Sequence, residues 1–384
     1  MLPAARISAA IVVLDRVLAG TPLDPALINW GRANRFAGSG DRAAIRDLVF
    51  DAWRCRRSYA ALGGGDTGRG LMLGRLRAAG EAVDQVFTGI GHAPSPQTDA
   101  DAPHPASTFA SLDCPDWLAP RLQHSLGDDF TQILQALQCR APVFLRVNTA
   151  RSTPDAVIAL LAADGIEAVA HPLAKTSLTV VTSSRKLLQT KAYLDGLFDL
   201  QDAASQAIVE DIPMVTGQTV LDYCAGGGGK TLALAARLQS NIYAYDAEPA
   251  RMRDLPYRAR RAGAEISILH SPAQHAPYDL VLVDAPCTGS GSWRRDPAGK
   301  WALTEARLAE LTTLQAQILD DAAPLVARYG VLAYVTCSLL ACENQDQIIG
   351  FSRRFPEWQQ TLQRRLTPLD GGDGFFLSVL TRII

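Results

Sequence analysis

The second half of this chain predicts the α/β class, with a doubly wound sheet that carries helices on both faces. From Leu197 onward, strand-like segments alternate with helical segments, which is typical of such sheets. Residues 219–246 contain a strand, a glycine-rich loop, a helix and a second strand that ends on an acid. Apolar residues at helical spacing fill the first 90 residues, so we expect a helical domain there. A small α+β module is expected between this domain and the sheet.

The composition is that of an ordinary soluble protein of two or three domains. The chain has 384 residues, 48% apolar and 20% charged, with a formal net charge of −2. Its seven cysteines contain no CxxC pair, and its histidines do not cluster, so we expect neither a disulfide framework nor a metal site. The sequence predicts no signal peptide and no membrane span, which points to the cytoplasm.

Residues 1–90 are expected to form the helical domain. Apolar residues recur at helical spacing from Ile7 to Leu18, and Gly20 ends that helix. Asp41 is expected to cap a further helix whose apolar face reaches Trp53. This region holds 12 Arg and 8 acidic residues, a local net charge of +4 (12 − 8), and no Lys. Its arginines fit a solvated helix face or contact with phosphates, and the first is the simpler interpretation.

The next segments predict a linker and a small module. Residues 91–108 hold four prolines and few large apolar groups, which is typical of a linker. Residues 109–200 are expected to form a helical connector and an RRM-like α+β module that can present RNA. In it, strands are expected at 144–149 and 178–182, and Thr153 caps the helix between them.

Residues 201–384 are expected to form the large sheet. A long helix is predicted from Thr304 to Tyr329, ended by Gly330. In such sheets ligands bind beyond the carboxyl ends of the strands. The further strands are expected at residues 242–246, 265–269, 278–286, 331–338 and 375–380.

The glycine-rich loop predicts a pocket for a nucleotide-like ligand. A P-loop is excluded because Cys224 stands where that motif needs glycine, and a dinucleotide fingerprint is weak because its third glycine would fall at Thr231. An S-adenosylmethionine (SAM) pocket and a glycine turn without ligand remain. The helix after the loop is expected over Lys230–Leu238, and Asp246 is placed to hold a ribose diol. The four consecutive glycines are Gly226, Gly227, Gly228 and Gly229.

Two cysteines follow two of the predicted strands. Cys287 follows Asp284 by three residues, and Cys337 stands at the end of its strand. A single cysteine is most often a small core residue, but two thiols at strand ends beside a SAM pocket suggest covalent catalysis. A thiolate that adds to C6 of a pyrimidine makes C5 nucleophilic toward a methyl donor. An acid near N3, such as Asp284, would stabilise the adduct.

The sequence resembles the Sun/Fmu (RsmB-type) family of SAM-dependent RNA cytosine-C5 methyltransferases. The resemblance spans about residues 140–384 and implies a Rossmann-like class I methyltransferase sheet. A looser match over residues 38–54 implies a NusB-like RNA-binding domain at the N-terminus. The matching segments are FLRVNT (144–149), QDAASQ (201–206), LDYCAGGGGKT (221–231), AYD (244–246), DAPCTGSGSWRRDP (284–297), KW (300–301), YVTCSLLACEN (334–344) and DGFFLSVLTR (373–382).

The resemblance implies catalytic roles for three residues. Cys337 would be the nucleophile that adds to C6, and Cys287 would assist product release. Asp284 would contact N3 and the amino group of the base and also line the cofactor pocket. Spacing alone does not choose the attacking cysteine: in DNA cytosine methyltransferases the nucleophile follows a proline, which would select Cys287.

The resemblance also implies a set of cofactor contacts. Residues Cys224, Ala225, Gly226 to Gly229 and Lys230 would wrap the methionine part of SAM, and Asp246 would bind the ribose hydroxyls. This chain departs from the family pattern twice. Gly227 replaces a proline, which predicts a more flexible loop. His270 or Ser271 stands where an acid usually lies near the adenine, which predicts weaker SAM binding.

The resulting hypothesis is a monomeric RNA cytosine-5 methyltransferase that uses SAM and acts on 16S (small-subunit) ribosomal RNA. The ribosomal substrate follows from the NusB-like resemblance. A transfer RNA substrate, a non-catalytic RNA-binding or ribosome assembly factor, and a small-molecule methyltransferase are the alternatives. The presence of both thiols and both acids argues against the non-catalytic factor, and the 200 residues before the SAM domain argue against a small-molecule substrate.

Overall fold

The computed structural model describes residues 1–182, 184–237 and 240–383, and the chain divides into two compact units. Unit 1 comprises Met1–Arg140 and Trp293–Ala302, and unit 2 comprises Ala141–Ser292 and Leu303–Ile384. No helix in the described part of the chain combines the length and apolar character needed to cross a bilayer. The predicted boundaries at residues 90, 108 and 200 stay predictions.

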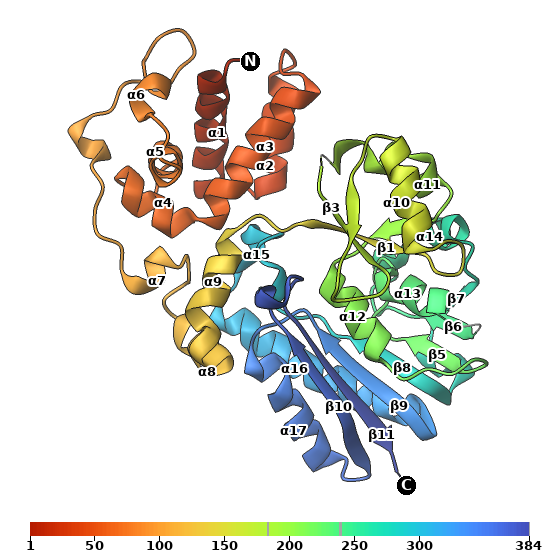
Figure 1. Cartoon of the computed structure of the whole chain (residues 1–384). Coiled ribbons are helices and arrows are strands. Elements are labelled where there is room, and N and C mark those ends of the chain that lie inside the picture. The colour runs from red at the N-terminus through yellow and green to blue at the C-terminus, as the bar shows by residue number, and fades with distance from the viewer. Residues whose placement is uncertain (183, 238–239, 384) are drawn as a thin grey trace. The chain divides into compact units, whose positions relative to one another are not determined.

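Unit 1 is built from helices (Figure 1). The first six lie within residues 1–90, so the expected all-helical start of the chain is confirmed. The helices of unit 1 are α1 (Pro3–Leu18), α2 (Leu23–Ala33), α3 (Ser39–Arg54), α4 (Arg56–Gly63), α5 (Gly68–Ala78), α6 (Val83–Val86), α7 (Thr108–Ser111), α8 (Ala119–Leu126), α9 (Phe130–Gln138) and α15 (Pro297–Ala302).

Asp41 does not cap a helix, so that prediction is wrong. Helix α3 begins two residues earlier, at Ser39, and Gly38 occupies the cap position. Asp41 lies in the first turn, where Oδ1 accepts hydrogen bonds from the amino group of Met1 at 3.1 Å and from Arg6 Nε at 2.9 Å. A carboxylate in the first turn still favours the helix electrostatically. Here it also fixes the N-terminus of the chain to α3.

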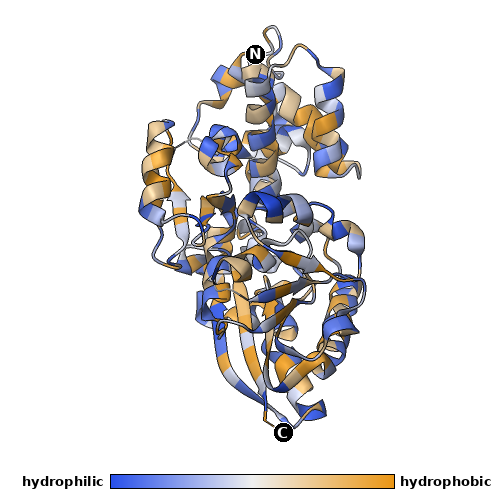
Figure 2. Cartoon of the chain, turned by 90° about the vertical axis from the view of Figure 1, so that its right-hand side faces the viewer, coloured by the Kyte–Doolittle hydropathy of each residue, from blue (hydrophilic) through white to orange (hydrophobic). Residues whose placement is uncertain are grey.

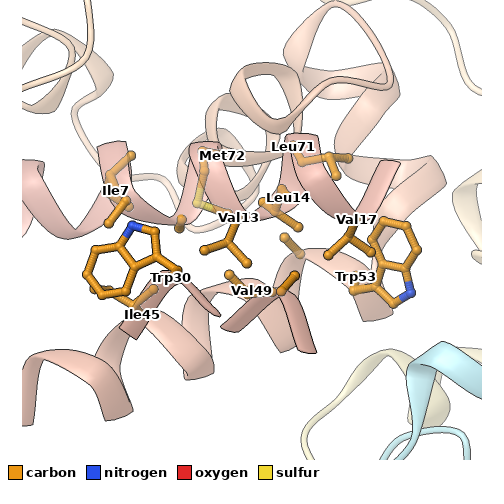
Figure 3. Close-up of a cluster of buried hydrophobic side chains, with 14 of the residues drawn as sticks. Ile7, Val13, Leu14, Val17, Trp30, Ile45, Val49, Trp53, Leu71 and Met72 are labelled. Atoms are coloured by element: carbon orange, nitrogen blue, oxygen red, sulfur yellow. The ribbon is translucent and has the colours of Figure 1, made fainter. Parts of the chain in front are cut away.

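The core of unit 1 lies between α1, α3 and α5. Figure 3 shows the side chains of Val13, Ile45, Val49 and Leu71 packed together, and each of these four is 0% exposed. They come from three helices whose apolar residues recur at helical spacing. Val12, the neighbour of Val13 on α1, is 44% exposed, so α1 turns one side to the core and one to solvent.

Residues Trp293–Ala302 belong to unit 1, although they lie in the sequence between two elements of unit 2. The Lys300 ammonium donates a hydrogen bond to the carbonyl of Arg54 at 3.0 Å, and Trp301 Nε1 donates to the carbonyl of Trp53 at 2.7 Å. Burial lowers the pKa of Lys300 to about 8. Two side chains of this short segment therefore satisfy carbonyls at the end of α3.

Unit 2 begins with a four-stranded antiparallel sheet of order β2-β3-β1-β4. Thr153 caps α10, because its side chain accepts a hydrogen bond from the N–H of Ala156 at 3.3 Å. The small module therefore has the predicted combination of helices and strands. Its elements are β1 (Val143–Val147), α10 (Pro154–Ala163), β2 (Ala168–Ala170), β3 (Ser177–Val180), α11 (Lys191–Leu194) and β4 (Phe198–Leu200).

The larger sheet of unit 2 has seven strands in the order β10-β11-β9-β8-β5-β6-β7. Neighbouring strands from β9 to β7 are parallel, whereas β11 is antiparallel to β9 and β10 is antiparallel to β11. The strands are β5 (Thr219–Asp222), β6 (Asn241–Ala244), β7 (Ile266–Ile268), β8 (Tyr278–Asp284), β9 (Val326–Thr336), β10 (Trp358–Leu366) and β11 (Phe375–Arg382).

Helices cover both faces of this sheet, which confirms the predicted fold class. Alternate residues of one strand enter different cores: Val220 packs with α12 and α13, whereas its neighbour Leu221 packs in the core that contains α16 and α17. Figure 2 shows hydrophobic and hydrophilic residues interspersed along helices and strands, as amphipathic elements require. The helices are α12 (Ala203–Asp211), α13 (Gly229–Arg237), α14 (Leu255–Ala262), α16 (Glu305–Ala322) and α17 (Gln345–Arg354).

The long helix predicted over Thr304–Tyr329 and ended by Gly330 is shorter, and that prediction is wrong over its last seven residues, 323–329. Helix α16 ends at Ala322, β9 begins at Val326, and Gly330 lies inside that strand. Pro324 lies in the 3₁₀ turn between them, where its missing N–H cannot continue the helix. Strand β10 was not predicted. Leu238, the predicted end of the helix after the glycine loop, lies outside the described residues.

We expect Val13→Ala to lower the free energy of unfolding by about 1–3 kcal/mol, because it leaves a cavity in the core of unit 1. The matched change Val12→Ala on the exposed side of the same helix should alter it by less than about 0.5 kcal/mol. Urea denaturation followed by circular dichroism measures both. Equal effects of the two substitutions would contradict the assignment of α1's buried side.

Candidate active site

Three strand ends come together at one edge of the large sheet. Strands β9, β8 and β5 are neighbours and run parallel, so their carboxyl ends point the same way. Asp222 ends β5, Asp284 ends β8 and Thr336 ends β9. The pairing of Asp284 with Val335 places the segments that follow β8 and β9 side by side. The candidate catalytic residues predicted from the sequence, Asp284, Cys287 and Cys337, lie at the end of β8 and in these two segments.

The structure brings the two predicted thiols into contact. Cys287 Sγ lies 3.4 Å from Cys337 Sγ, and both side chains are partly exposed. The adjacent thiol of Cys337, and then burial, raise the pKa of Cys287 well above its ordinary value. Cys287 therefore stays a neutral thiol at neutral pH. A neutral thiol is a weak nucleophile that can still donate a weak hydrogen bond.

Lys230 and Asp284 form an ion pair next to the thiols. Lys230 Nζ lies 2.7 Å from Asp284 Oδ2, with 10% of the lysine side chain and 32% of the aspartate side chain exposed. Burial lowers the pKa of Lys230, but the charges of Asp284 and, more weakly, Cys337 and Asp222 together outweigh it, so the pKa is raised. The lysine is therefore a fixed cation at this edge of the sheet.

The glycine loop has a backbone that needs glycine at two positions. Gly226 has a φ of +49° and Gly228 a φ of +78°, in the left-handed region that favours glycine. A Cβ on Gly228 would lie 2.2 Å from a side-chain carbon of Leu255. The N–H of Gly226 donates to Asp246 Oδ2 at 3.0 Å, which joins the loop to the end of β6. The loop is thus shaped by its glycines and fixed by an acid.

Asp246 is a buried carboxylate whose oxygens already accept backbone hydrogen bonds. Oδ1 accepts from the N–H of Glu248 at 3.0 Å, and Arg251 Nη1 lies 3.4 Å from Oδ2. Only 3% of Asp246 is exposed. Each carboxylate oxygen has more than one acceptor position, so this acid can still accept hydroxyl donors from a ligand.

Asp222 is a buried acid behind the loop. It is 1% exposed, and Thr231 Oγ1 donates to its Oδ2 at 2.6 Å. Its Oδ1 has no hydrogen-bond partner among the described residues. Burial raises the pKa of Asp222 to about 7, and the bond from Thr231 opposes this only in part. A buried carboxyl oxygen without a partner is a candidate acceptor for a ligand's donor group.

Gly227, which replaces the expected proline, is held through its carbonyl. Arg258 Nη1 donates to that oxygen, and Arg258 Nη2 donates to Asp199 Oδ2 at 2.7 Å. Asp199 lies on β4 of the small module. Burial raises the pKa of Asp199, but three arginines, Arg258 first, lower it more. An ion pair therefore connects the small module with the glycine loop.

Not every predicted residue takes part in these contacts. His270 and Ser271 follow β7, which β6 separates from β5, and both are exposed. Cys224 is half-buried, and burial raises its pKa. Sequence reasoning missed Glu343, a fully buried acid behind the thiols. Among the residues that the structure describes, no group of three or more His, Cys, Asp or Glu side chains is arranged to hold a metal ion.

Comparisons with known proteins identify the family of this chain. The family model described as 16S rRNA methyltransferase RsmB/F matches residues 212–380, and the RsmF/B-like ferredoxin-like domain matches residues 114–185. A ribosomal RNA small subunit methyltransferase B from Salmonella arizonae is 32% identical over 294 residues. The chain belongs to the RsmB/F family of 16S rRNA methyltransferases.

Other RsmB/F relatives and solved structures extend the match. The Salmonella arizonae alignment covers 71% of this chain and 68% of that relative; a relative of the same name from Photorhabdus laumondii is 31% identical over 70% of this chain and 66% of its own. The chain thus spans about two thirds of these relatives. The crystal structure of PH0851 covers 99% of both chains at 25% identity and a TM-score of 0.77. A methyltransferase homologue from Pyrococcus horikoshii covers 72% of this chain and 97% of its own, with 25% identity and a TM-score of 0.62.

We expect Asp222→Asn to flatten the pH dependence of stability. Between the ordinary aspartate pKa of 3.8 and about 7, the folded state keeps a proton that the unfolded state has released. Asp222 therefore lowers stability as pH rises through this window, by up to about 1.4 kcal/mol per pH unit. Urea denaturation at pH 4.5, 5.5 and 6.5 should show a more negative slope for the wild type. Identical slopes would contradict the raised pKa.

Proposed function

We propose that this chain methylates C5 of cytosine in 16S ribosomal RNA, with SAM as methyl donor, through a covalent adduct between Cys337 and C6. The observation that carries the proposal is the 3.4 Å contact between Cys287 and Cys337 beside the Lys230–Asp284 pair. The names of the similar proteins support a ribosomal RNA substrate.

Cys337 is assigned the nucleophilic role because the charges around the two thiols differ. The raised pKa of Cys287 keeps it neutral, which disfavours it as the attacking group. The pKa of Lys230 is raised in part by its interaction with Cys337, so a cation lies near this thiol and not only near Asp284. Addition of the Cys337 sulfur to C6 places negative character on C5, which then becomes the methyl acceptor.

Asp284 and Cys287 have supporting roles in the proposed reaction. Asp284 is partly exposed and has one oxygen that Lys230 does not occupy, so it can contact N3 and the amino group of the base. After the proton on C5 has been removed, the Cys337 sulfur leaves C6. Cys287, at contact distance, can donate a hydrogen bond to this departing sulfur.

The residues at the strand ends fit a cationic nucleoside such as SAM. The glycine loop leads into the N-terminus of α13, Asp246 can accept from ribose hydroxyls, and Asp222 offers an unpartnered buried oxygen. When bound, SAM supplies an electrophilic methyl group on a positively charged sulfur. The acids Asp246 and Asp284 give this edge a negative character that favours such a charge.

We expect Cys337→Ala to lower methyl transfer to RNA by about a thousandfold or more, because the covalent nucleophile is lost. Cys287→Ala should instead accumulate an RNA–protein adduct that survives denaturation. Transfer of labelled methyl groups to 16S RNA, bisulfite sequencing of the product and denaturing gels measure these outcomes.

The exposed Cys139 gives the matched control, since it belongs to unit 1 whereas Cys287 and Cys337 belong to unit 2. Cys139→Ala should retain activity and form no stable adduct. Full activity of Cys337→Ala, or a product without 5-methylcytosine, would refute the proposed reaction.

We expect Asp246→Ala to raise the dissociation constant of SAM about tenfold or more, since a hydrogen bond to a charged group contributes roughly 1.5–3 kcal/mol. Asp254 is a suitable control because its side chain is 73% exposed. Asp254→Ala should leave the constant within about twofold of the wild type. Isothermal titration calorimetry measures both, and an unchanged constant for Asp246→Ala would remove this residue from the pocket.

A further inference from the structure

A buried glutamate lies directly behind the two thiols. Glu343 ends the short 3₁₀ turn Ala341–Glu343 and is 0% exposed. Burying a carboxylate is unfavourable unless hydrogen bonds compensate for the lost hydration. Here the compensating donors come from the segments that carry the cysteines. Glu343 has no role in the proposed reaction that would explain these hydrogen bonds.

One set of hydrogen bonds fixes the segment around Cys287. Thr288, the next residue, donates its N–H to Glu343 Oε1 at 2.8 Å and its hydroxyl to Oε2 at 2.5 Å. Gln315 Nε2 donates to Glu343 Oε1 at 3.0 Å and to the carbonyl of Pro286 at 2.8 Å. The residues on both sides of Cys287 are therefore held by Glu343, directly or through Gln315.

A second set fixes the segment around Cys337. The hydroxyl of Ser338, the next residue, donates to Glu343 Oε2. Ser338 Oγ also lies 3.1 Å from Ser290 Oγ, and the N–H of Gly291 donates to the carbonyl of Cys337 at 2.9 Å. The carboxylate of Glu343 thus receives hydrogen bonds from both residues that follow the cysteines. Ser290 and Gly291, from the segment after Cys287, bond in turn to Ser338 and Cys337.

We propose that Glu343 is the positioning residue that holds Cys287 and Cys337 in contact, by accepting hydrogen bonds from Thr288 and Ser338 at the same time. Hydrogen bonds to a charged acceptor are shorter and stronger than neutral ones, so the carboxylate restricts both segments more than a neutral group of the same size. The catalytic consequence rests on the proposed function, whereas the geometric claim does not.

The electrostatics agree with this assignment. The negative charge of Glu343 is one of the causes that raise the pKa of Cys287, after Cys337 and burial. The acid that orients the pair therefore also favours the neutral form of one partner. The two thiols are thereby made chemically different although they lie side by side.

Phenylarsine oxide tests the geometry without any turnover. Its arsenic forms two bonds to two adjacent thiols, and the oxygen leaves as water with both thiol protons. In the full-length chain, peptide mass spectrometry identifies arsenic that bridges Cys287 and Cys337. We expect Glu343→Ala to weaken this capture at least about tenfold, whereas Glu343→Gln, which keeps the shape and can still bond to both hydroxyls, should stay within about threefold of the wild type.

The same variants separate positioning from binding in the enzymatic reaction. Glu343→Ala should lower kcat about a hundredfold, the scale expected when reacting groups move by about 1 Å, and leave the SAM dissociation constant within about twofold. Glu343→Gln should recover most of kcat. The matched control is Asp346→Ala, the nearby exposed acid on α17, which should leave capture and kcat unchanged.

Capture by Glu343→Ala equal to that of the wild type would overturn the proposal, as would equal losses in the Ala and Gln variants. If Glu343→Ala does not fold, Thr288→Val and Ser338→Ala remove one hydroxyl bond each. Weaker capture in both supports the proposal, and unchanged capture in both refutes it. If Glu343→Ala weakens arsenic capture as expected but the wild type does not methylate RNA, the proposed function fails while the positioning claim stands.

Discussion

The parallel register of β9, β8 and β5 is the constraint on which the site depends. Adjacent strands lie about 4.8 Å apart, so segments that leave neighbouring parallel strands at the same level start within side-chain reach of each other. Because Asp284 pairs with Val335, Cys287 and Cys337 emerge at nearly the same level, and their sulfurs touch. A slip of two residues would move one strand end by about 6.6 Å and separate the thiols.

One cation, Lys230, interacts with two groups at this edge of the sheet. Lys230 is paired with Asp284 and also interacts with Cys337, while burial raises the pKa of Asp222 to about 7, so this acid carries only part of its charge at neutral pH. Fewer uncompensated charges are therefore buried than the number of acids suggests. The hydrogen bond from Arg258 to the Gly227 carbonyl restrains the glycine loop. A proline at this position would instead stiffen the backbone by fixing φ.

The sequence predicted the class, the order of the major elements and the meeting of the two thiols, because these follow from periodicity and from the rule for parallel strands. Predictions from local sequence patterns were wrong or incomplete where contacts with distant segments determine the structure. The helix α16 was extended too far since the apolar residues of Val326–Gly330 fit a helix or a strand. Strand β10 was missed because its side chains are mostly exposed and polar. Glu343 was missed because its partners come from three separate segments, which no short motif reveals.

The chain topology adds a reason why the segment after the thiol loop is stable. The residues that follow Ser292 enter unit 1, where Lys300 and Trp301 bond to carbonyls at the end of α3, and the chain then returns to unit 2 at Leu303. A loop fixed at both ends samples fewer conformations than one with a free end, so ordering it costs less entropy. The hydrogen bonds of Lys300 and Trp301 therefore restrict the segment that follows Ser292. Deleting residues 1–140 would remove the carbonyl partners of Lys300 and Trp301 and return that entropy to the segment.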